Sequence, residues 1–320
     1  MNNCVGYVVI GLNEGEKLQL CLTSILIVNK NIVYVDSGSI DGSVIFAKSL
    51  GIDVVELDMS LPFTAGRARN EGAKMLLQND DYEYIHFIDG DCQLEPNWTR
   101  NALVFMEADA KNAIVYGHLR ERNPEKSIFN ALCQIEWDTP LGDVKSCGGI
   151  ALVRANIFKE FNGFRGDFIA GEEPELCFRL RSSGWKIRKI DYEMAVHDAE
   201  MYKFSQWWKR RVRCGFAFTE GTMLHGLSEE RYWIRDTLSI FFWGIFIPLI
   251  TIILCFLSML FLIILLIYPI QYLRIVYKNR KKVENCFAWA FYTVLGKFPE
   301  AIGLMKFVTK SFKRIHLLSV

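Results

Sequence analysis

Short apolar runs separated by polar segments dominate the first sixty residues. Val5–Leu12, Ile32–Val35 and Asp53–Leu57 are rich in β-branched residues and predict strands. The segments between them have the apolar spacing of amphipathic helices. Strands that alternate with helices predict a parallel sheet, and ligands of such sheets sit at the carboxyl ends of the strands.

A further buried strand, Tyr84–Ile88, ends abruptly in Asp89, Gly90 and Asp91. Two carboxylates at the end of a buried strand are costly without a partner. Carboxylates are hard oxygen donors that suit Mg²⁺ or Mn²⁺, and Mg²⁺ is commonly bound together with substrate phosphates. The sequence therefore predicts a divalent cation with a diphosphate here. The alternative is a tight turn with two solvated acids, because Asp-Gly is a common turn signal.

Polar residues follow the first two predicted strands at the same edge of the sheet. Asn13 and Glu14 follow the first strand, and Asp36 and Ser37 follow the second. A carboxylate at this edge can accept a hydrogen bond from a base or a ribose hydroxyl, and the Ser/Gly-rich loop after Asp36 suits a nucleotide. The alternative is an ordinary loop in which Asp41 caps the next helix.

The segment Pro62–Lys74 predicts a helix that points Arg67 and Arg69 toward this edge. Arginine binds phosphate oxygens with two parallel hydrogen bonds, so these side chains are candidates for the diphosphate. A solvated helix face is the alternative.

Three later segments carry further candidate chemistry. Cys147–Val153 predicts a strand entered through glycines, of which Gly149 leaves room for a sugar against the backbone, or for a packed helix. Glu172 and Glu173 open a helix, where negative charge is stabilised, so they are acid–base candidates or simple caps. His197 follows the predicted strands Trp185–Ile190 and Glu193–Val196 and could bind a metal, although a lone histidine is more often structural.

The last third of the chain is strongly apolar. No charged residue lies between Asp236 and Arg274, a segment that would be roughly 55 Å long as one helix, against a hydrocarbon core of about 30 Å. We therefore expect two helices, with a turn near residues 255–259 and a kink at Pro248. Each is short for a full span, so a spanning and a re-entrant hairpin both stay open. The alternative is a buried hairpin of a soluble protein.

Charge separates the two parts of the chain. Residues 1–202 hold 20 basic and 30 acidic residues, whereas residues 203–320 hold 17 and 6. A basic, apolar end favours lipid over nucleic acid. The aromatic and basic segment Phe204–Arg213 suits a membrane interface. The nine cysteines are scattered singly, and no signal peptide precedes the first strand, so we expect a cytoplasmic catalytic part.

The order of these motifs resembles that of a family 2 glycosyltransferase over roughly residues 4–215. The segments that carry the resemblance are Asn13–Glu14, Asp36–Ser43, Ala68–Asn70, Asp89–Asp91, Gly148–Gly149, Gly163–Phe164 and Gly171–Glu173. The resemblance implies the GT-A fold, an α/β architecture with a Rossmann-like, mostly parallel central sheet flanked by helices, followed here by C-terminal hydrophobic helices.

The resemblance also implies roles for single residues. Asp36 would contact the nucleotide base, and Asp89 and Asp91 would bind the metal, with His197 completing its shell. One of Glu172 and Glu173 would be the catalytic base of an inverting transfer. The family more often has Glu-Asp where this chain has two glutamates, and Glu173 holds the usual base position.

The sequence as a whole predicts a GT-A domain over residues 1–225, a membrane hairpin over 226–282 and a basic amphipathic tail over 283–320. The predicted donor is a nucleotide-diphosphate sugar, more probable as UDP than as GDP or dTDP. The predicted acceptor is lipid-linked or saccharide, at the inner membrane, in envelope or extracellular polysaccharide synthesis. Two alternatives are a polyprenyl-phosphate glycosyl synthase and a catalytically silent membrane subunit that binds nucleotide sugars.

Overall fold

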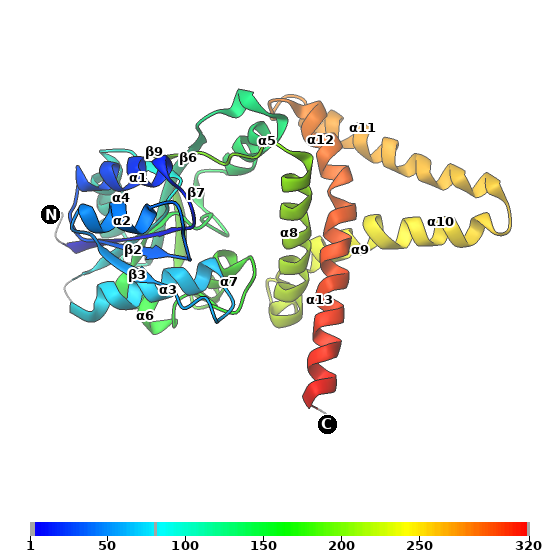
Figure 1. The fold of residues 1–320 in the computed structure, drawn as a ribbon. Helices are drawn as coiled ribbons and strands as arrows, with labels where there is room; N and C mark the ends of the chain where they lie inside the picture. The colour runs from blue at the N-terminus through cyan, green and yellow to red at the C-terminus, as the bar shows by residue number, and fades with distance from the viewer. Residues whose placement is uncertain (1–3, 80–81, 319–320) are drawn as a thin grey trace. The chain divides into compact units, whose positions relative to one another are not determined.

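A computed structural model describes residues 4–79 and 82–318 of the chain, which divide into two compact units (Figure 1). The first unit comprises Met1–Pro124 and Glu136–Glu200, and the second comprises Glu125–Ile135 and Met201–Val320. The units divide near residue 200, whereas the sequence pattern had suggested a domain end after residue 225.

The first unit is built on one mixed sheet in the order β3-β2-β1-β4-β8-β6-β9-β5, with β7 paired to β9. The strands β1 to β4 are parallel to one another, as the alternation of strands and helices predicted. Beyond β4 the pairings with β8 are antiparallel. The strands are β1 (Val5–Gly11), β2 (Ile32–Asp36), β3 (Asp53–Glu56), β4 (Tyr84–Asp89), β5 (Cys92–Leu94), β6 (Asn112–Glu121), β7 (Gly142–Asp143), β8 (Ala151–Arg154) and β9 (Lys186–His197).

Two predicted strands differ from the observed ones. The strand expected over Cys147–Val153 begins only at Ala151, because Gly148 and Gly149 have positive φ angles that end the extended conformation. The strands expected over Trp185–Ile190 and Glu193–Val196 form the single strand β9, which pairs along β6 through register shifts. The polar residues between the two runs therefore do not form a turn.

Helices cover both faces of this sheet (Figure 1). Glycines allow a close approach of α3: an added Cβ at Gly72 would overlap Val8 and Val35 of the sheet. The core is formed by the apolar strand residues and by the inward faces of the helices. These are α1 (Glu16–Leu26), α2 (Ser43–Ser49), α3 (Ala65–Leu76), α4 (Trp98–Ala108), α6 (Ala155–Glu160) and α7 (Glu172–Ser182), with short helical turns η2 (Leu77–Asn79) and η3 (Pro124–Lys126).

The second unit is helical. Its longest helices α8 and α13 pack closely, because an added Cβ at Gly215 or Gly303 would overlap the backbone of the opposite helix. Between them, Glu300 is fully buried and pairs with Arg211 and Lys297. The helices are α5 (Ile128–Trp137), which ends in the first unit, α8 (Phe204–His225), α9 (Ile234–Phe241), α10 (Ile247–Cys255), α11 (Ile267–Asn279), α12 (Cys286–Leu295) and α13 (Lys297–Leu318).

The charge-free segment forms a helical hairpin within this unit (Figure 1). Its first arm runs from α9 through the π-helical turn η4 (Phe242–Phe246) into α10, and its second arm runs from η5 (Met259–Leu266) into α11. The turn between residues 255 and 259 confirms the predicted position. The arms Ile234–Cys255 and Met259–Asn279 are each long and apolar enough to cross a membrane.

Candidate active site

The polar residues predicted to share one edge of the sheet do lie together at the carboxyl ends of neighbouring strands. Asp36 pairs in register with Gly11, and Asp89 pairs with Ile10. The Ser37 amide continues the ladder by donating to the Gly11 carbonyl at 3.1 Å. This regular pairing of β1 with β2 and β4 is what brings residues 36 and 89 to the same edge.

Asp36 is buried and accepts three hydrogen bonds. The Tyr34 hydroxyl donates to Oδ1 at 2.9 Å, and the amides of Gly38 and Ser39 donate to Oδ2 at 2.9 and 2.8 Å. The Ser37 hydroxyl is also buried, and it has no hydrogen-bond partner within the described part of the chain. Buried hydroxyls are normally paired, so this group is suited to an incoming ligand.

The loops after β1 and β2 are joined by hydrogen bonds. The Asn13 amide donates to the Ser39 hydroxyl, and the Asn13 side chain accepts from the Ile40 amide, both at 2.8 Å. The Gly15 amide donates to Asp41 at 2.8 Å. Asn13 has a φ of 55°, a left-handed conformation that asparagine tolerates better than most residues. Asn13 therefore shapes this edge.

Arg69 connects two of the predicted acids. Its side chain is buried, and it donates to Asp89 and to Glu172, each at 2.8 Å. Gly149 lies directly against it, since a Cβ added there would be 2.9 Å from the guanidinium, and its φ of 90° also favours glycine. The guanidinium stacks over Phe164 at 5.7 Å. Residues distant in sequence thus converge on a single arginine.

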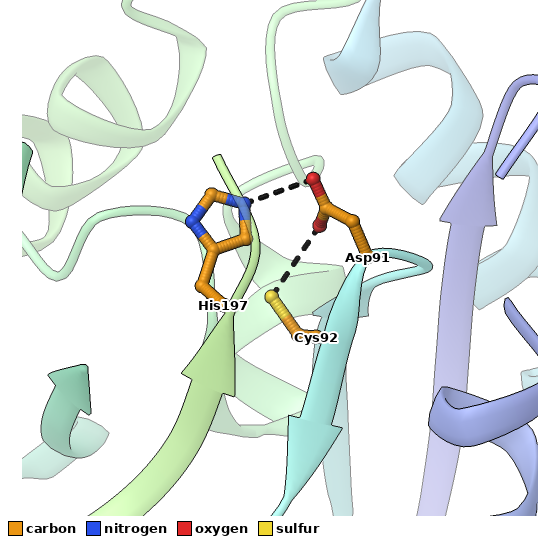
Figure 2. A group of neighbouring side chains, drawn as sticks. All are labelled: Asp91, Cys92 and His197. Carbon is orange, nitrogen blue, oxygen red and sulfur yellow. Dashed lines mark hydrogen bonds and ion pairs between the residues drawn. The ribbon is translucent and has the colours of Figure 1, made fainter. Parts of the chain in front are cut away.

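Asp91 and His197 form a second pair in the same unit (Figure 2). Nε2 of His197 lies 2.9 Å from Asp91 Oδ2, and the Cys92 thiol donates to Asp91 Oδ1 at 3.4 Å. The Trp137 ring packs on the imidazole with centroids 4.7 Å apart. Burial disfavours a charged ring, but the hydrogen bond to Asp91 and the negative charges of Asp91, Asp89 and Glu121 together outweigh it and raise the pKa of His197.

The pKa values of Asp89 and Asp91 are shifted in opposite directions. Burial raises the pKa of Asp89, against the opposing effect of Arg69. Burial also opposes ionisation of Asp91, but the His197 hydrogen bond lowers its pKa. Both carboxylates also act on Glu14, whose pKa is raised mainly by burial although Lys17 pairs with it at 2.9 Å. Asp89, Asp91, His197 and Glu14 are therefore close enough to influence one another.

Glu172 and Glu173 point to different partners from the first turn of α7. Glu172 faces Arg69, whereas Glu173 accepts from the Cys147 amide at 2.6 Å and from the Cys177 thiol at 3.0 Å. Glu173 is 5% exposed. The helix begins at Glu172, as expected.

These residues fit a divalent cation. Donor atoms of Asp91, Cys92 and His197 lie within 4.8 Å of one another. Nδ1 of His197 is buried and has no hydrogen-bond partner among the residues that the structure describes. Burial raises the pKa of the Cys92 thiol, which therefore stays neutral and leaves the oxygen of Asp91 and the nitrogen of His197 as donors. Carboxylate oxygens suit both Mg²⁺ and Mn²⁺.

Sequence reasoning missed four residues of this site, which are Lys17, Trp137, Cys147 and Cys177. Lys17 lies three residues after Glu14 at helical spacing, a signal that could have revealed the pair. Trp137 and the pair Cys147 and Cys177 carried no such signal, because their contacts join distant parts of the chain. The two sulfurs lie 4.0 Å apart, and none of the nine cysteines is in a disulfide.

Comparisons with known proteins agree with this architecture. The sequence profile described as "Glycosyl transferase family 2" matches residues 7–156, while no curated protein sequence matches the chain. Among solved structures, the mannosyltransferase PcManGT from Pyrobaculum calidifontis, in complex with GDP-Man and Mn²⁺, has 12% identity and a TM-score of 0.63. The similarity covers 95% of this chain and 88% of that one.

A second similar structure is S. aureus TarS 1-349 in complex with UDP-GlcNAc, with 13% identity and a TM-score of 0.51, covering 73% of this chain and 71% of that one. At these identities the structural likeness establishes the fold. The sequence profile shows that residues 7–156 are similar to glycosyl transferase family 2, and the structural likeness shows that the fold is GT-A.

Proposed function

We propose that the chain is an inverting glycosyltransferase that takes a sugar from a nucleotide-diphosphate donor, with UDP favoured. The acceptor is lipid-linked or saccharide, at the cytoplasmic face of the inner membrane, and the product serves envelope or extracellular polysaccharide synthesis. The observation that carries the proposal is the convergence of Asp89 and Glu172 on Arg69. Arg69 thereby connects the strand-end acid Asp89, beside the Asp91–His197 pair, to the helix that carries both candidate bases.

Each part of the site has a role in this proposal. Asp36 and Ser37 bind the base and ribose, because one buried carboxylate is fixed by backbone donors and one buried hydroxyl lacks a partner. Asp89, Asp91 and His197 would hold Mg²⁺ or Mn²⁺. When bound, the cation offsets the charge of the departing diphosphate. The complexes of PcManGT with GDP-Man and Mn²⁺, and of TarS with UDP-GlcNAc, support a donor of this class.

Glu172 and Glu173 are the two candidates for the base. The base accepts the proton of the acceptor hydroxyl while its oxygen attacks the anomeric carbon from the face opposite the diphosphate. The bond from the sugar to the diphosphate breaks as the new bond forms, which inverts the anomeric configuration. Glu173 holds the position that the family resemblance gives to the base, and Glu172 is the one connected to Asp89 through Arg69.

The hairpin supports the membrane part of the proposal. Large apolar side chains of both arms are exposed, including Leu249, Ile253, Ile263 and Leu266. Such a surface is costly in water, and both arms are apolar enough for a membrane. Basic residues flank the charge-free segment on both sides, as at membrane segments whose ends lie in the cytoplasm.

The test uses purified full-length protein, a panel of UDP-, GDP- and dTDP-sugars, and Mn²⁺. We expect one donor to raise the melting temperature in the presence of Mn²⁺ and to be slowly hydrolysed, because binding to the folded state alone stabilises it. Binding of a donor without hydrolysis would indicate a silent membrane subunit, and a protein that neither bound nor hydrolysed any of these donors would also overturn the proposal.

Glu172→Gln, Glu173→Gln and the double variant identify the base. We expect loss of sugar transfer in the variant that lacks the base, with donor-induced stabilisation retained. Near-normal transfer by the double variant would instead indicate a polyprenyl-phosphate glycosyl synthase, because a phosphate acceptor is already an anion and needs no base.

A further inference from the structure

Other helices of the second unit pack against the base of the apolar hairpin. Only a short part, near the turn, is free of them in the described chain. At Gly244 the first arm lies against α13, since an added Cβ would overlap the Lys297 carbonyl and contact Ala301. Lys297 and the buried Glu300 belong to the charged cluster with Arg211. A charged cluster of this kind belongs at the polar boundary of a membrane and not in its hydrocarbon core.

Aromatic residues mark the same level on both arms. The Tyr268 hydroxyl of the second arm donates to the Trp243 carbonyl of the first at 2.6 Å, and their rings lie 5.9 Å apart. Tryptophan and tyrosine are enriched where membranes meet water. The membrane boundary that the charges of Lys297 and Glu300 indicate therefore lies at the level of the Trp243–Tyr268 pair.

From this level to the turn, the hairpin is shorter than a bilayer. Gly244 and Leu257 are thirteen positions apart in the chain, which corresponds to about 20 Å of helix. Ser258 and Tyr268 are ten positions apart, which gives a similar length of about 20 Å because much of that arm is a 3₁₀-helix. A hydrocarbon core is about 30 Å thick. An inserted hairpin thus passes the midplane and ends before the opposite surface.

The turn itself has the composition of a segment in hydrocarbon. Phe256, Leu257, Met259 and Leu260 are between 72% and 87% exposed, and Ser258 is the one polar residue among them. A turn that emerged on the far side of a membrane would expose these side chains to water. It has no charged or aromatic amphipathic residue to anchor it there, since the nearest charges are Asp236 and Arg274.

The polar backbone groups of the turn are largely satisfied internally. The amides of Phe256, Leu257 and Ser258 donate to carbonyls of the last turn of α10 at 3.2, 2.9 and 3.1 Å. Ser258 accepts from the amide of Leu260 with its hydroxyl and from that of Phe261 with its carbonyl. Irregular backbone is excluded from hydrocarbon chiefly because its polar groups lack partners, and this turn meets that requirement.

A groove of about 510 Å³ between the arms is also lined by apolar side chains. Its lining includes Pro248, Ile252, Met259 and Leu262, and the one hydroxyl in it, of Thr251, already donates to the Ile247 carbonyl at 2.8 Å. Such a groove offers nothing to hold water, whereas lipid chains fill it without cost.

We propose that the hairpin is re-entrant: it enters the bilayer from the side of the catalytic domain, ends inside the hydrocarbon, and returns to the same side. This inference rests on the membrane location in the proposed function and adds its topology. The partner is the hydrocarbon interior of a lipid bilayer, and the protein reaches it from one leaflet without exposing a loop on the opposite face.

The test measures which side of the membrane reaches the turn. In full-length protein, the partly exposed Cys4, Cys214 and Cys255 are replaced by serine, which leaves the six buried thiols. Ser258→Cys then places one thiol at the turn, Met259→Cys is a second such variant, and Lys281→Cys is the control on the exposed basic flank. Inside-out and right-side-out inner-membrane vesicles are treated with a charged, membrane-impermeant maleimide.

We expect no labelling of the turn variants from either face, full labelling after detergent is added, and labelling of Lys281→Cys from one face only. Labelling of the turn from the face opposite Lys281→Cys would show a spanning hairpin and overturn the proposal. Labelling from the same face would show that the hairpin lies outside the bilayer. Sugar transfer, measured on the same vesicles, tests the enzymatic proposal separately, because it does not depend on which topology holds.

Discussion

Arg69 is the residue on which most of the proposed chemistry depends. One buried guanidinium holds Asp89 of β4 and Glu172 of α7, and Gly149 provides the space for it. The sequence had suggested that this side chain would bind phosphate directly. In the structure its charge is shared between two acids, so we propose that Arg69 positions these carboxylates for the donor.

Arg69→Gln tests this assignment. We expect the free energy of unfolding to fall by about 1–3 kcal/mol, because the partly buried carboxylates of Asp89 and Glu172 lose their charged hydrogen-bond donor. We also expect weaker Mn²⁺ binding, since Asp89 loses the charge that favours its ionised form. Chemical denaturation and a Mn²⁺ titration measure the two effects.

Arg67→Gln is the matched control on the same helix, because Arg67 donates only to backbone carbonyls of Asp58, Leu61 and Pro62. We expect little change in Mn²⁺ binding from this substitution. Equal losses in both variants would contradict the role of Arg69.

His86 is a second residue with a measurable consequence. It is fully buried in β4, stacks on Tyr7 at 5.3 Å, and accepts a 2.7 Å hydrogen bond from the Trp98 indole at Nε2. Burial lowers its pKa from 6.5 to about 3. Between these values the unfolded chain binds a proton that the folded protein excludes, so stability decreases as the pH falls through that window.

His86→Gln keeps an acceptor for Trp98 but does not titrate. We expect wild-type protein to lose about 2 kcal/mol more than the variant between pH 7 and pH 5, because each pH unit below 6.5 contributes about 1.4 kcal/mol. Urea unfolding at a series of pH values measures this difference. Parallel curves for the two proteins would show that His86 is protonated in the folded state.

At the scale of elements, glycines set the spacing between α8 and α13. Gly215 and Gly303 let the two helices approach closely, and Glu300 is buried beside this contact with Arg211 and Lys297. Burial, together with the nearby charge of Arg211, lowers the pKa of Lys297 to about 8. A close helix pair with a charged centre requires a fixed register between the two helices.

Gly303→Ala is expected to destabilise the second unit by about 1–3 kcal/mol, because the new methyl group would overlap the Val212 carbonyl and force the helices apart. Thr309→Ala on the exposed face of the same helix is the control, with an expected change within about 0.5 kcal/mol. Thermal unfolding followed by circular dichroism measures both. A Gly303→Ala protein as stable as the control would show that the helices do not pack in this way.

The elements also show what local sequence patterns could and could not predict. The strands β1 to β4, the helix that carries Arg69 and the turn at residues 256–258 were predicted, because each depends on nearby periodicity or composition. The start of β8 and the continuity of β9 were not, because positive φ at Gly148 and Gly149 and a long pairing with β6 decide them.

The candidate site divides in the same way. Strand ends 36 and 89 could be placed at one edge from the strand–helix alternation alone. The different partners of Glu172 and Glu173 could not be predicted, because the two acids are adjacent and have the same sequence context. The thiol contact of Glu173 with Cys177 and the ring contact of His197 with Trp137 depend on tertiary packing.

At the scale of the whole molecule, the chain combines an acidic catalytic part with a basic, apolar end. Residues 1–202 have a net charge of −10 and residues 203–320 a net charge of +11. Attraction to anionic lipid therefore acts on the second part and not on the first. The exposed residues Arg280, Lys281 and Lys282 follow the second arm of the hairpin directly.

The double variant Lys281→Ala and Lys282→Ala measures this attraction. We expect about 2 kcal/mol weaker binding to vesicles that contain anionic lipid, or roughly 30-fold, because each basic residue near the surface contributes about 1 kcal/mol. Vesicle sedimentation at low salt measures it, with neutral vesicles as the control. An equal loss on neutral vesicles would indicate damage to the hairpin and not a lost charge attraction.

The hydrogen bonds from Asn13 to Ser39 and Ile40, and from Gly15 to Asp41, have a consequence for engineering. These hydrogen bonds connect the loop after β1 to the loop after β2. A change in the conformation of one loop therefore requires a change in the other. A chimera that receives the 36–43 segment of another transferase without the matching 13–15 segment would lose the bonds that Ser39 and Asp41 accept with their side chains, unless the new segment has equivalent acceptors. Transplanting a new donor preference into this scaffold will require both segments from the same parent.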